Sequence, residues 1–275
     1  MDYPEEGVAE SDATFVPAGK TSGPVNHRVF PTTLRRVVRH HLGLDIDRDL
    51  TVRDWLLLPE QVLRTFSTGG VFYDGLNQLE PLRRKLAYYP HEVWLYLLSA
   101  QWQRIGQEEP FVGRAGIVGD SLGSAVIAAR LVRDVMRLCF LMEKTYAPYP
   151  KWFGSAFARL DCAPRLTPIL EAAIRVPSWQ ERKAHLSAAY EIAAAMHNAL
   201  GLTEPVPEKV SRFHGRPFRV IQGETIARKI WERIGDPSVK DLPFGVGKVD
   251  QFGDSTDLLS EVDRTRKLSP VYTGG

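Results

Sequence analysis

Residues 120–144, DSLGSAVIAARLVRDVMRLCFLMEK, contain the clearest regular pattern in the chain and decide its fold class. With 3.6 residues per helical turn, their apolar side chains fall on two adjoining faces. These faces cover more than half of the helix circumference, which is wider than a surface helix needs. The pattern therefore predicts a central helix. The two faces are Ile127, Leu131, Val135, Leu138 and Met142, and Val132, Met136, Cys139 and Phe140.

The rest of this helix is a narrow polar stripe of Arg130, Arg133, Asp134 and Arg137, at positions i, i+3, i+4 and i+7. Burial of such groups is costly unless they are paired or face a wet cavity. One interpretation is a cleft for an anionic ligand, because guanidinium groups bind phosphate or carboxylate oxygens in a bidentate way. The other is a solvent-facing edge with an Arg130–Asp134 pair. Local pairing does not explain the like-charged neighbours Arg133 and Arg137, and both interpretations stay open.

A comparable stripe of Gln101, Arg104 and Glu108 lies on the helix predicted over residues 91–108. That helix already has a separate polar face. Two polar surfaces on one helix indicate that one of them contacts something other than bulk water. Glu108 and Glu109 are candidates for a general base, and a solvated acidic helix end is the alternative. Four further residues are candidate ligand-binding groups. Arg114 and Asp120 lead into the central helix. Lys151 and Trp152 lie in the aromatic loop after it, which would either line a pocket by stacking or pack two helices together.

Composition limits the classes of function. The 275 residues include 35 basic and 33 acidic side chains, and a net charge of +2 gives no broad surface for nucleic acid. Two cysteines are too few for a disulfide scaffold, and no spacing indicates a metal site, so a cytoplasmic protein is expected. Four charges interrupt the longest apolar stretch, Ala125–Met142, which argues against a membrane span. A small-molecule or anionic ligand remains the expected partner, and the oligomeric state is undetermined.

The whole chain predicts a mainly α protein, a helical bundle with a short β remnant at the N-terminus. Residues 1–26 are rich in Gly, Pro and acidic side chains and are expected to be a flexible lead-in. Residues 27–259 are expected to form the helical domain, with remnant and linker helices over 27–80 and the bundle over 81–259. A second weak strand is predicted at Arg216–Ile221. The charged residues 260–275 are expected to be a disordered tail.

Several blocks of sequence resemble a known family. The blocks lie at 102–105, 108–114, 118–120, 128–134, 146–149, 151–154, 197–198, 216–218 and 250–252. They include Glu108-Glu109-Pro110-Phe111-Val112-Gly113-Arg114 and Lys151-Trp152-Phe153-Gly154. Together they closely resemble the bacterial family known as domain of unknown function 4037, over roughly residues 27 to 259.

The resemblance implies a nucleotidyltransferase-like domain ahead of this helical part. Such a domain has a Gly-Ser turn for the triphosphate and an aspartate pair for divalent metal. The Gly-Ser dipeptides of this chain, at Gly123 and Gly154, fall in predicted helices, and Asp45-Ile46-Asp47 follows a helix. The chain is therefore interpreted as N-terminally truncated or catalytically silent. It is expected to have no cofactor of its own, with magnesium and a nucleoside triphosphate belonging to the missing domain.

Two functions follow, and whether the chain is an enzyme stays open. In the first, it is the substrate-binding half of a nucleotidyltransferase-like protein and is inactive alone. Glu108 or Glu109 would then be the acceptor-side base, and Arg114, Arg130 and Arg133 would hold phosphates or an acidic acceptor. In the second, it is a non-catalytic helical module that binds a small molecule or a partner through the same cleft.

Overall fold

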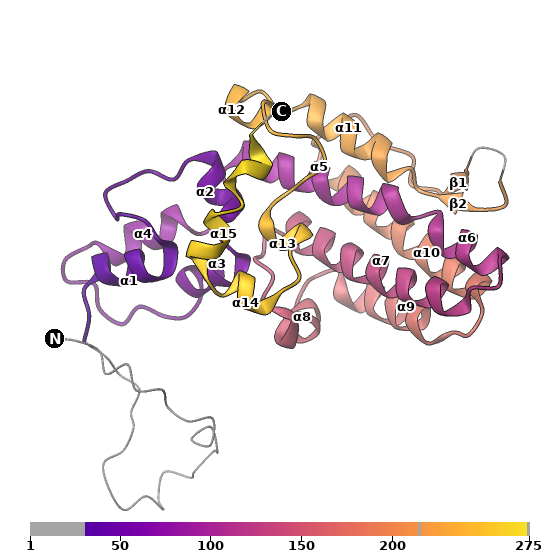
Figure 1. Ribbon diagram of the computed structural model, residues 1–275, viewed down its shortest axis with the longest axis horizontal. Coiled ribbons are helices and arrows are strands. Elements are labelled where there is room, and N and C mark those ends of the chain that lie inside the picture. Colours follow the sequence, from indigo (N-terminus) through magenta and orange to yellow (C-terminus); the bar gives the residue numbers. More distant parts are fainter. Residues whose placement is uncertain (1–30, 214–215, 274–275) are drawn as a thin grey trace, which may run out of the picture. The chain divides into compact units, whose positions relative to one another are not determined.

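The structure, a computed structural model, describes residues 31–213 and 216–273, and helices dominate it (Figure 1). The chain divides into two compact units, Met1–Thr33 and Leu34–Gly275, and every helix and strand described below belongs to the second. The expected lead-in over residues 1–26 and the β-compatible residues 27–30 lie outside the described residues. The prediction of a mainly α fold is confirmed.

Three long helices form the centre of the bundle: α5 (His91–Glu108), α7 (Ser121–Met142) and α10 (Trp179–Ala199) (Figure 1). Helix α7 packs against both α5 and α10, and its residues Leu131, Val135 and Leu138 have no exposed surface. The prediction that this helix is central is therefore confirmed. Shorter helices pack around the three, namely α6 (Phe111–Ile117), α9 (Ala163–Arg175) and α11 (Gly223–Glu232), and α8 (Pro150–Phe157) follows α7.

Helix α5 is enclosed on nearly all sides, since residues 93–102 are all buried. Its closest neighbour is α11, and two glycines allow this approach. A Cβ atom on Gly106 would lie 2.4 Å from the backbone nitrogen of Glu224, and one on Gly223 would lie 2.6 Å from the carbonyl oxygen of Trp102. Both distances are shorter than real contacts allow, so glycine at these positions lets the two helix backbones touch.

Short elements flank the bundle at both ends of the described chain. Before it come α1 (Leu34–Leu42), α2 (Val52–Leu57), α3 (Glu60–Ser67) and α4 (Leu79–Lys85). After it come α12 (Pro237–Lys240), α13 (Val249–Phe252), α14 (Thr256–Leu259), α15 (Val262–Arg266) and the 3-10 helix η2 (Ser269–Tyr272). Within the described residues, no helix is both long and apolar enough to cross a bilayer.

The described residues form β structure at one of the two predicted places and not at the N-terminal one. Residues 31–33 form no strand and lead directly into α1, and Pro31 has no N–H to donate to a sheet. The strands of the described chain are β1 (Ser211–Arg212) and β2 (Arg219–Val220), which lie between α10 and α11. They pair antiparallel, with Ser211 opposite Val220. The strand predicted at Arg216–Ile221 is therefore present in shortened form. The prediction of a β remnant at the N-terminus is wrong, because the β structure of the described residues lies toward the C-terminus.

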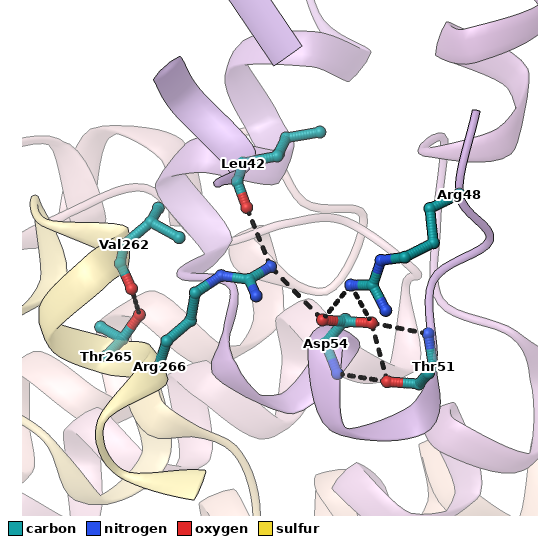
Figure 2. A network of polar contacts seen from close by, with 7 residues as sticks. All are labelled: Leu42, Arg48, Thr51, Asp54, Val262, Thr265 and Arg266. Atoms are coloured by element: carbon teal, nitrogen blue, oxygen red, sulfur yellow. Dashed lines mark hydrogen bonds and ion pairs between the residues drawn. The ribbon is translucent and has the colours of Figure 1, made fainter. Parts of the chain in front are cut away.

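The expected disordered tail at 260–275 is also corrected, because its described part is folded against the N-terminal helices. Figure 2 shows the contact: one guanidinium nitrogen of Arg266 donates to the Leu42 carbonyl (3.1 Å) and to the Asp54 carboxylate (3.3 Å). Asp54 also caps α2 by accepting from Thr51. Thr265 and Tyr272 are buried. Arg266 is one of the charged residues from which disorder was predicted, yet it holds this segment in place. Its partners lie more than 200 residues earlier in the chain.

Replacing Arg266 with leucine should therefore loosen the C-terminal segment, since leucine retains apolar bulk but makes neither hydrogen bond. The guanidinium is partly exposed, so we expect the free energy of unfolding to fall by about 1 kcal/mol, below the usual value for a hydrogen bond to a charged group. Amide hydrogen exchange over residues 262–272 should become faster. The matched control is Lys267→Leu at the exposed neighbouring position. Equal exchange rates in the two variants would show that other contacts hold the segment.

Candidate functional site

The polar stripe of α7 lines two adjoining hollows in the surface of the bundle. The larger hollow has a volume of about 530 Å³ and the smaller one about 250 Å³. Arg133 and Arg137 line both, together with Asp254 from the segment between α13 and α14. The stripe therefore borders a concave site, as the cleft interpretation predicts.

Most of the larger hollow is apolar. Its walls come from the start of α3, one face of α7, the loop into α8 with the first turn of α8, Ile174 of α9, and the segment from Asp250 to Ser260. Because these pieces span about 200 positions of the sequence, only the folded chain forms the cavity. The main apolar lining residues are Val132, Met136, Pro148, Tyr149, Phe153 and Leu259.

The two arginines shared by the hollows differ in their partners. Arg133 forms an ion pair with Asp254, and this contact lowers the pKa of the Asp254 carboxyl. Among the described residues, Arg137 has no carboxylate within ion-pair distance. Its guanidinium carbon instead lies 5.8 Å from the centre of the Phe153 ring, a cation–π contact. Arg137 is therefore the cation of the site that remains available to an anion.

Buried ionisable groups form the floor of the larger hollow. The Asp250 carboxylate accepts from the Glu60 backbone N–H (3.1 Å) and pairs with the Lys248 ammonium (2.9 Å). The Glu60 carboxylate accepts from the Tyr89 hydroxyl (3.1 Å). Burial raises the pKa of Glu60, although the Lys248 charge acts against this, and so does the more weakly acting Arg137. Glu60 is therefore protonated more readily than an exposed glutamate.

The smaller hollow is lined mainly by charged side chains, and it contains the residues that the sequence grouped together. Asp134 is buried and accepts from Gln101 (3.1 Å) and from Arg104 (3.3 Å). Arg130 pairs with Glu108 at 2.8 Å. The structure therefore brings Arg104, Arg130, Arg133 and Asp134 together, with Glu108 beside them.

Gln101 reaches neither hollow, because its side chain is fully buried between helices. Its amide nitrogen donates to Asp134, and its amide oxygen accepts from Gln251 of α13 at 3.0 Å. The Gln251 amide oxygen in turn accepts from the Lys248 backbone N–H (2.9 Å). Gln101 was predicted as a ligand contact. Its observed contacts are those of a positioning residue that joins the smaller hollow to the floor of the larger one.

Glu109 lies apart from both hollows and holds the segment after β2. Its two carboxylate oxygens accept from the backbone N–H groups of Ile221 (2.6 Å) and Gly223 (3.0 Å). Burial raises the pKa of Glu109 to about 7, while these hydrogen bonds and the Lys183 charge lower it. Between the two amides lies Gln222, whose φ of 60° is left-handed. With both oxygens engaged, Glu109 anchors this turn, and these contacts do not support the predicted general-base role.

The other four predicted site residues also line neither hollow. Arg114 is exposed and stacks over Phe111, and the Asp120 carboxylate caps α7 by accepting from the Gly123 N–H (2.7 Å). Lys151 and Trp152 are exposed and contact each other. Their neighbours Tyr149 and Phe153 face the larger hollow instead. The loop is thus part of the site, but through different aromatic residues.

The residues that sequence reasoning missed share one property, which is that their roles depend on distant partners. Arg137 was assigned to the polar stripe but not to the site, because nothing in its own helix shows that it lacks a carboxylate. Glu60 and Asp250 are separated by 190 positions. Among the described residues, no group of three or more His, Cys, Asp or Glu side chains is placed to hold a metal ion.

Residues 55–153 match the family described as Domain of unknown function (DUF4037). This match confirms the resemblance predicted from the sequence over that range, and it says nothing about activity. It covers the walls of the site formed by α3, α7 and the start of α8, and it ends before the segment 248–260. The nucleotidyltransferase-like context and a bacterial origin stay predictions. No curated protein and no solved structure matches the chain.

The raised pKa of Glu109 predicts a specific pH dependence of stability. A carboxyl whose pKa is about 4.5 unfolded and about 7 folded stabilises the protein most below pH 4.5 and loses this contribution as pH rises through 7. Glu109→Gln removes the ionisation. We compare the free energy of unfolding of Glu109→Gln with that of the unmodified protein. The difference should be about 2 kcal/mol more in favour of Glu109→Gln at pH 7.5 than at pH 5.

Urea unfolding of both proteins at the two pH values measures this difference, and other titrating groups largely cancel in the comparison. Glu92→Gln is the control, because Glu92 also accepts from backbone N–H groups, those of Gly235 and Asp236, but is only half-buried. If the difference in unfolding free energy between the two proteins does not change with pH, the folded protein stabilises the charged Glu109 carboxylate as well as water does, and the prediction is wrong.

Proposed function

We propose that this chain binds a small amphipathic acid in the larger hollow, with the apolar body of the ligand against α7 and α8 and its anionic end on Arg137. The single observation that carries the proposal is the position of Arg137. Its guanidinium has no carboxylate partner among the described residues and lines a mostly apolar cavity.

The cavity has the size and lining of a small-molecule site. A volume of about 530 Å³ falls in the range of about 300–1,000 Å³ that is usual for ligand pockets. Such pockets combine apolar walls with a few convergent polar groups that orient the ligand. Here Met136 and Phe153 contribute to the apolar walls, and Arg133 and Arg137 provide the polar groups.

Charge determines which end group fits. Guanidinium groups are cations, and the half-buried Arg137 places one at the cavity. The floor carboxyl on which Arg137 acts, Glu60, has a raised pKa because it is buried, and it holds its negative charge less readily than an exposed carboxyl. A ligand carboxylate would supply the missing anion and form a bidentate pair with the guanidinium.

The proposal is one of binding, and it needs no catalytic group. It corresponds to the second of the two functions that the sequence suggests, a helical module that binds a small molecule. The first function, a substrate-binding half of a nucleotidyltransferase-like protein, would use the same hollow for its acceptor. In that case magnesium and a nucleoside triphosphate would belong to the other half.

Calorimetric titration with decanoate and with decanol, each below its micelle concentration, tests the proposal. We expect decanoate to bind saturably and at least about tenfold more tightly than decanol, because one charge-assisted hydrogen bond is worth about 1.5–3 kcal/mol. Arg137→Gln should remove this preference and leave decanol binding unchanged.

The matched control is Arg175→Gln on α9, where the arginine is exposed and pairs with Glu171 of its own helix. This variant should bind both compounds as the unmodified protein does. The proposal is wrong if the acid and the alcohol bind equally, if decanoate does not bind, or if Arg137→Gln and Arg175→Gln behave alike.

A further inference from the structure

We infer that the anionic end of the ligand is a phosphate monoester rather than a carboxylate, with the phosphate in the smaller hollow and its apolar substituent in the larger one. The inference rests on the proposed function and names its ligand class. It follows from the geometry of the junction between the two hollows, where Arg133 and Arg137 line both. A group placed at that junction is in contact with both cavities at once.

The smaller hollow has more positive than negative charge. Four arginines line it, and three carboxylates pair with them: Asp134 with Arg104, Glu108 with Arg130, and Asp254 with Arg133. Arg137 is the fourth arginine, without such a partner among the described residues. One uncompensated positive charge therefore remains in a hollow of about 250 Å³.

The three ion pairs differ in how easily they open. The Asp134 side chain is only 5% exposed and is also held by Gln101, so Arg104 stays with it. The Asp254 side chain is 73% exposed, and an exposed pair of this kind contributes little stability. The Arg130 side chain is itself 55% exposed. An incoming anion can therefore displace Asp254 and share Arg130 at small cost.

The spacing of the available arginines fits a group with several oxygens. Arg130, Arg133 and Arg137 occupy one face of α7 over about 10 Å of helix length, and their long side chains can converge on one point. A carboxylate has one charge and two oxygens, which Arg137 alone satisfies. A phosphate monoester has a charge between about −1.5 and −2 and three terminal oxygens, and it would use all three guanidinium groups.

Titration with decyl phosphate, compared with decanoate, tests the inference. We expect the unmodified protein to bind decyl phosphate at least about tenfold more tightly than decanoate. Arg130→Gln should lower the affinity for decyl phosphate by about fivefold or more and leave decanoate binding unchanged, because Arg130 lines only the smaller hollow. Asp254→Asn should act in the opposite direction and raise the affinity for decyl phosphate, because it removes the competing carboxylate.

Arg114→Gln is the matched control, since Arg114 is exposed on α6 and lines neither hollow. If decanoate binds through Arg137 but decyl phosphate binds no more tightly, this inference fails and the proposed function stands. If neither compound binds, the proposed function fails as well. If Arg130→Gln and Asp254→Asn both weaken binding, the effect is structural and the inference is wrong.

Two further arms separate the sources of a phosphate. Inorganic phosphate should bind more weakly than decyl phosphate, because it leaves the larger hollow empty. Vesicles that contain phosphatidic acid should not compete with decyl phosphate, because the apolar chain of a bilayer lipid would have to leave the membrane to enter the cavity. Competition by vesicles, or equal binding of inorganic phosphate, would overturn the assignment to a dissolved monoester.

Discussion

The buried carboxylate of Asp134 determines how the rest of the site is arranged. A carboxylate on a side chain that is only 5% exposed is stable in a helical core only when donors compensate it, and here Gln101 and Arg104 of α5 do so. These bonds fix the rotation of α7 against α5. Once that rotation is set, Arg133 and Arg137 face the surface hollows, while Val135 and Leu138 stay in the core. The same contact that stabilises the helix pair therefore presents the arginines.

The segment from Lys248 to Asp254 completes the site, and it belongs to the part of the chain beyond the family match. It crosses the bundle at α5, where Gln251 donates to Gln101 (3.0 Å), and it reaches the end of α2, where the Lys248 ammonium donates to the Leu58 carbonyl (2.9 Å). Without this segment, α7 would present its arginines on an open surface, as the alternative interpretation of the stripe assumed. Both interpretations concern the same helix, and the hollow on which the cleft interpretation depends is formed by contacts far along the chain.

How much of this was predictable follows from the range of each interaction. Helix α7 and its polar stripe depend on residues within a few turns of each other, so periodicity was enough to find them. The role of Glu109 was not predictable, because its partners Ile221 and Gly223 come more than 100 residues later. The tail was predicted to be disordered from its charges, yet Arg266 is ordered by Asp54. Composition indicates which groups need partners, but only the fold determines whether they find them.

Two carboxyl groups are buried next to the arginines of the proposed site, and both bear on its charge. The Asp134 carboxylate pairs with Arg104 of α5, so it forms no ion pair with the arginines of its own helix. Glu60 lies on the floor of the larger hollow, where burial favours its protonated form and its main hydrogen-bond partner is a tyrosine. Neither carboxyl forms an ion pair with Arg137, whose charge acts only at longer range on Glu60 and on the Asp254 carboxylate that Arg133 binds. In a partly buried cavity such a charge interacts more strongly with an ion than it would in water, and this is the physical reason why the proposed ligand is an anion.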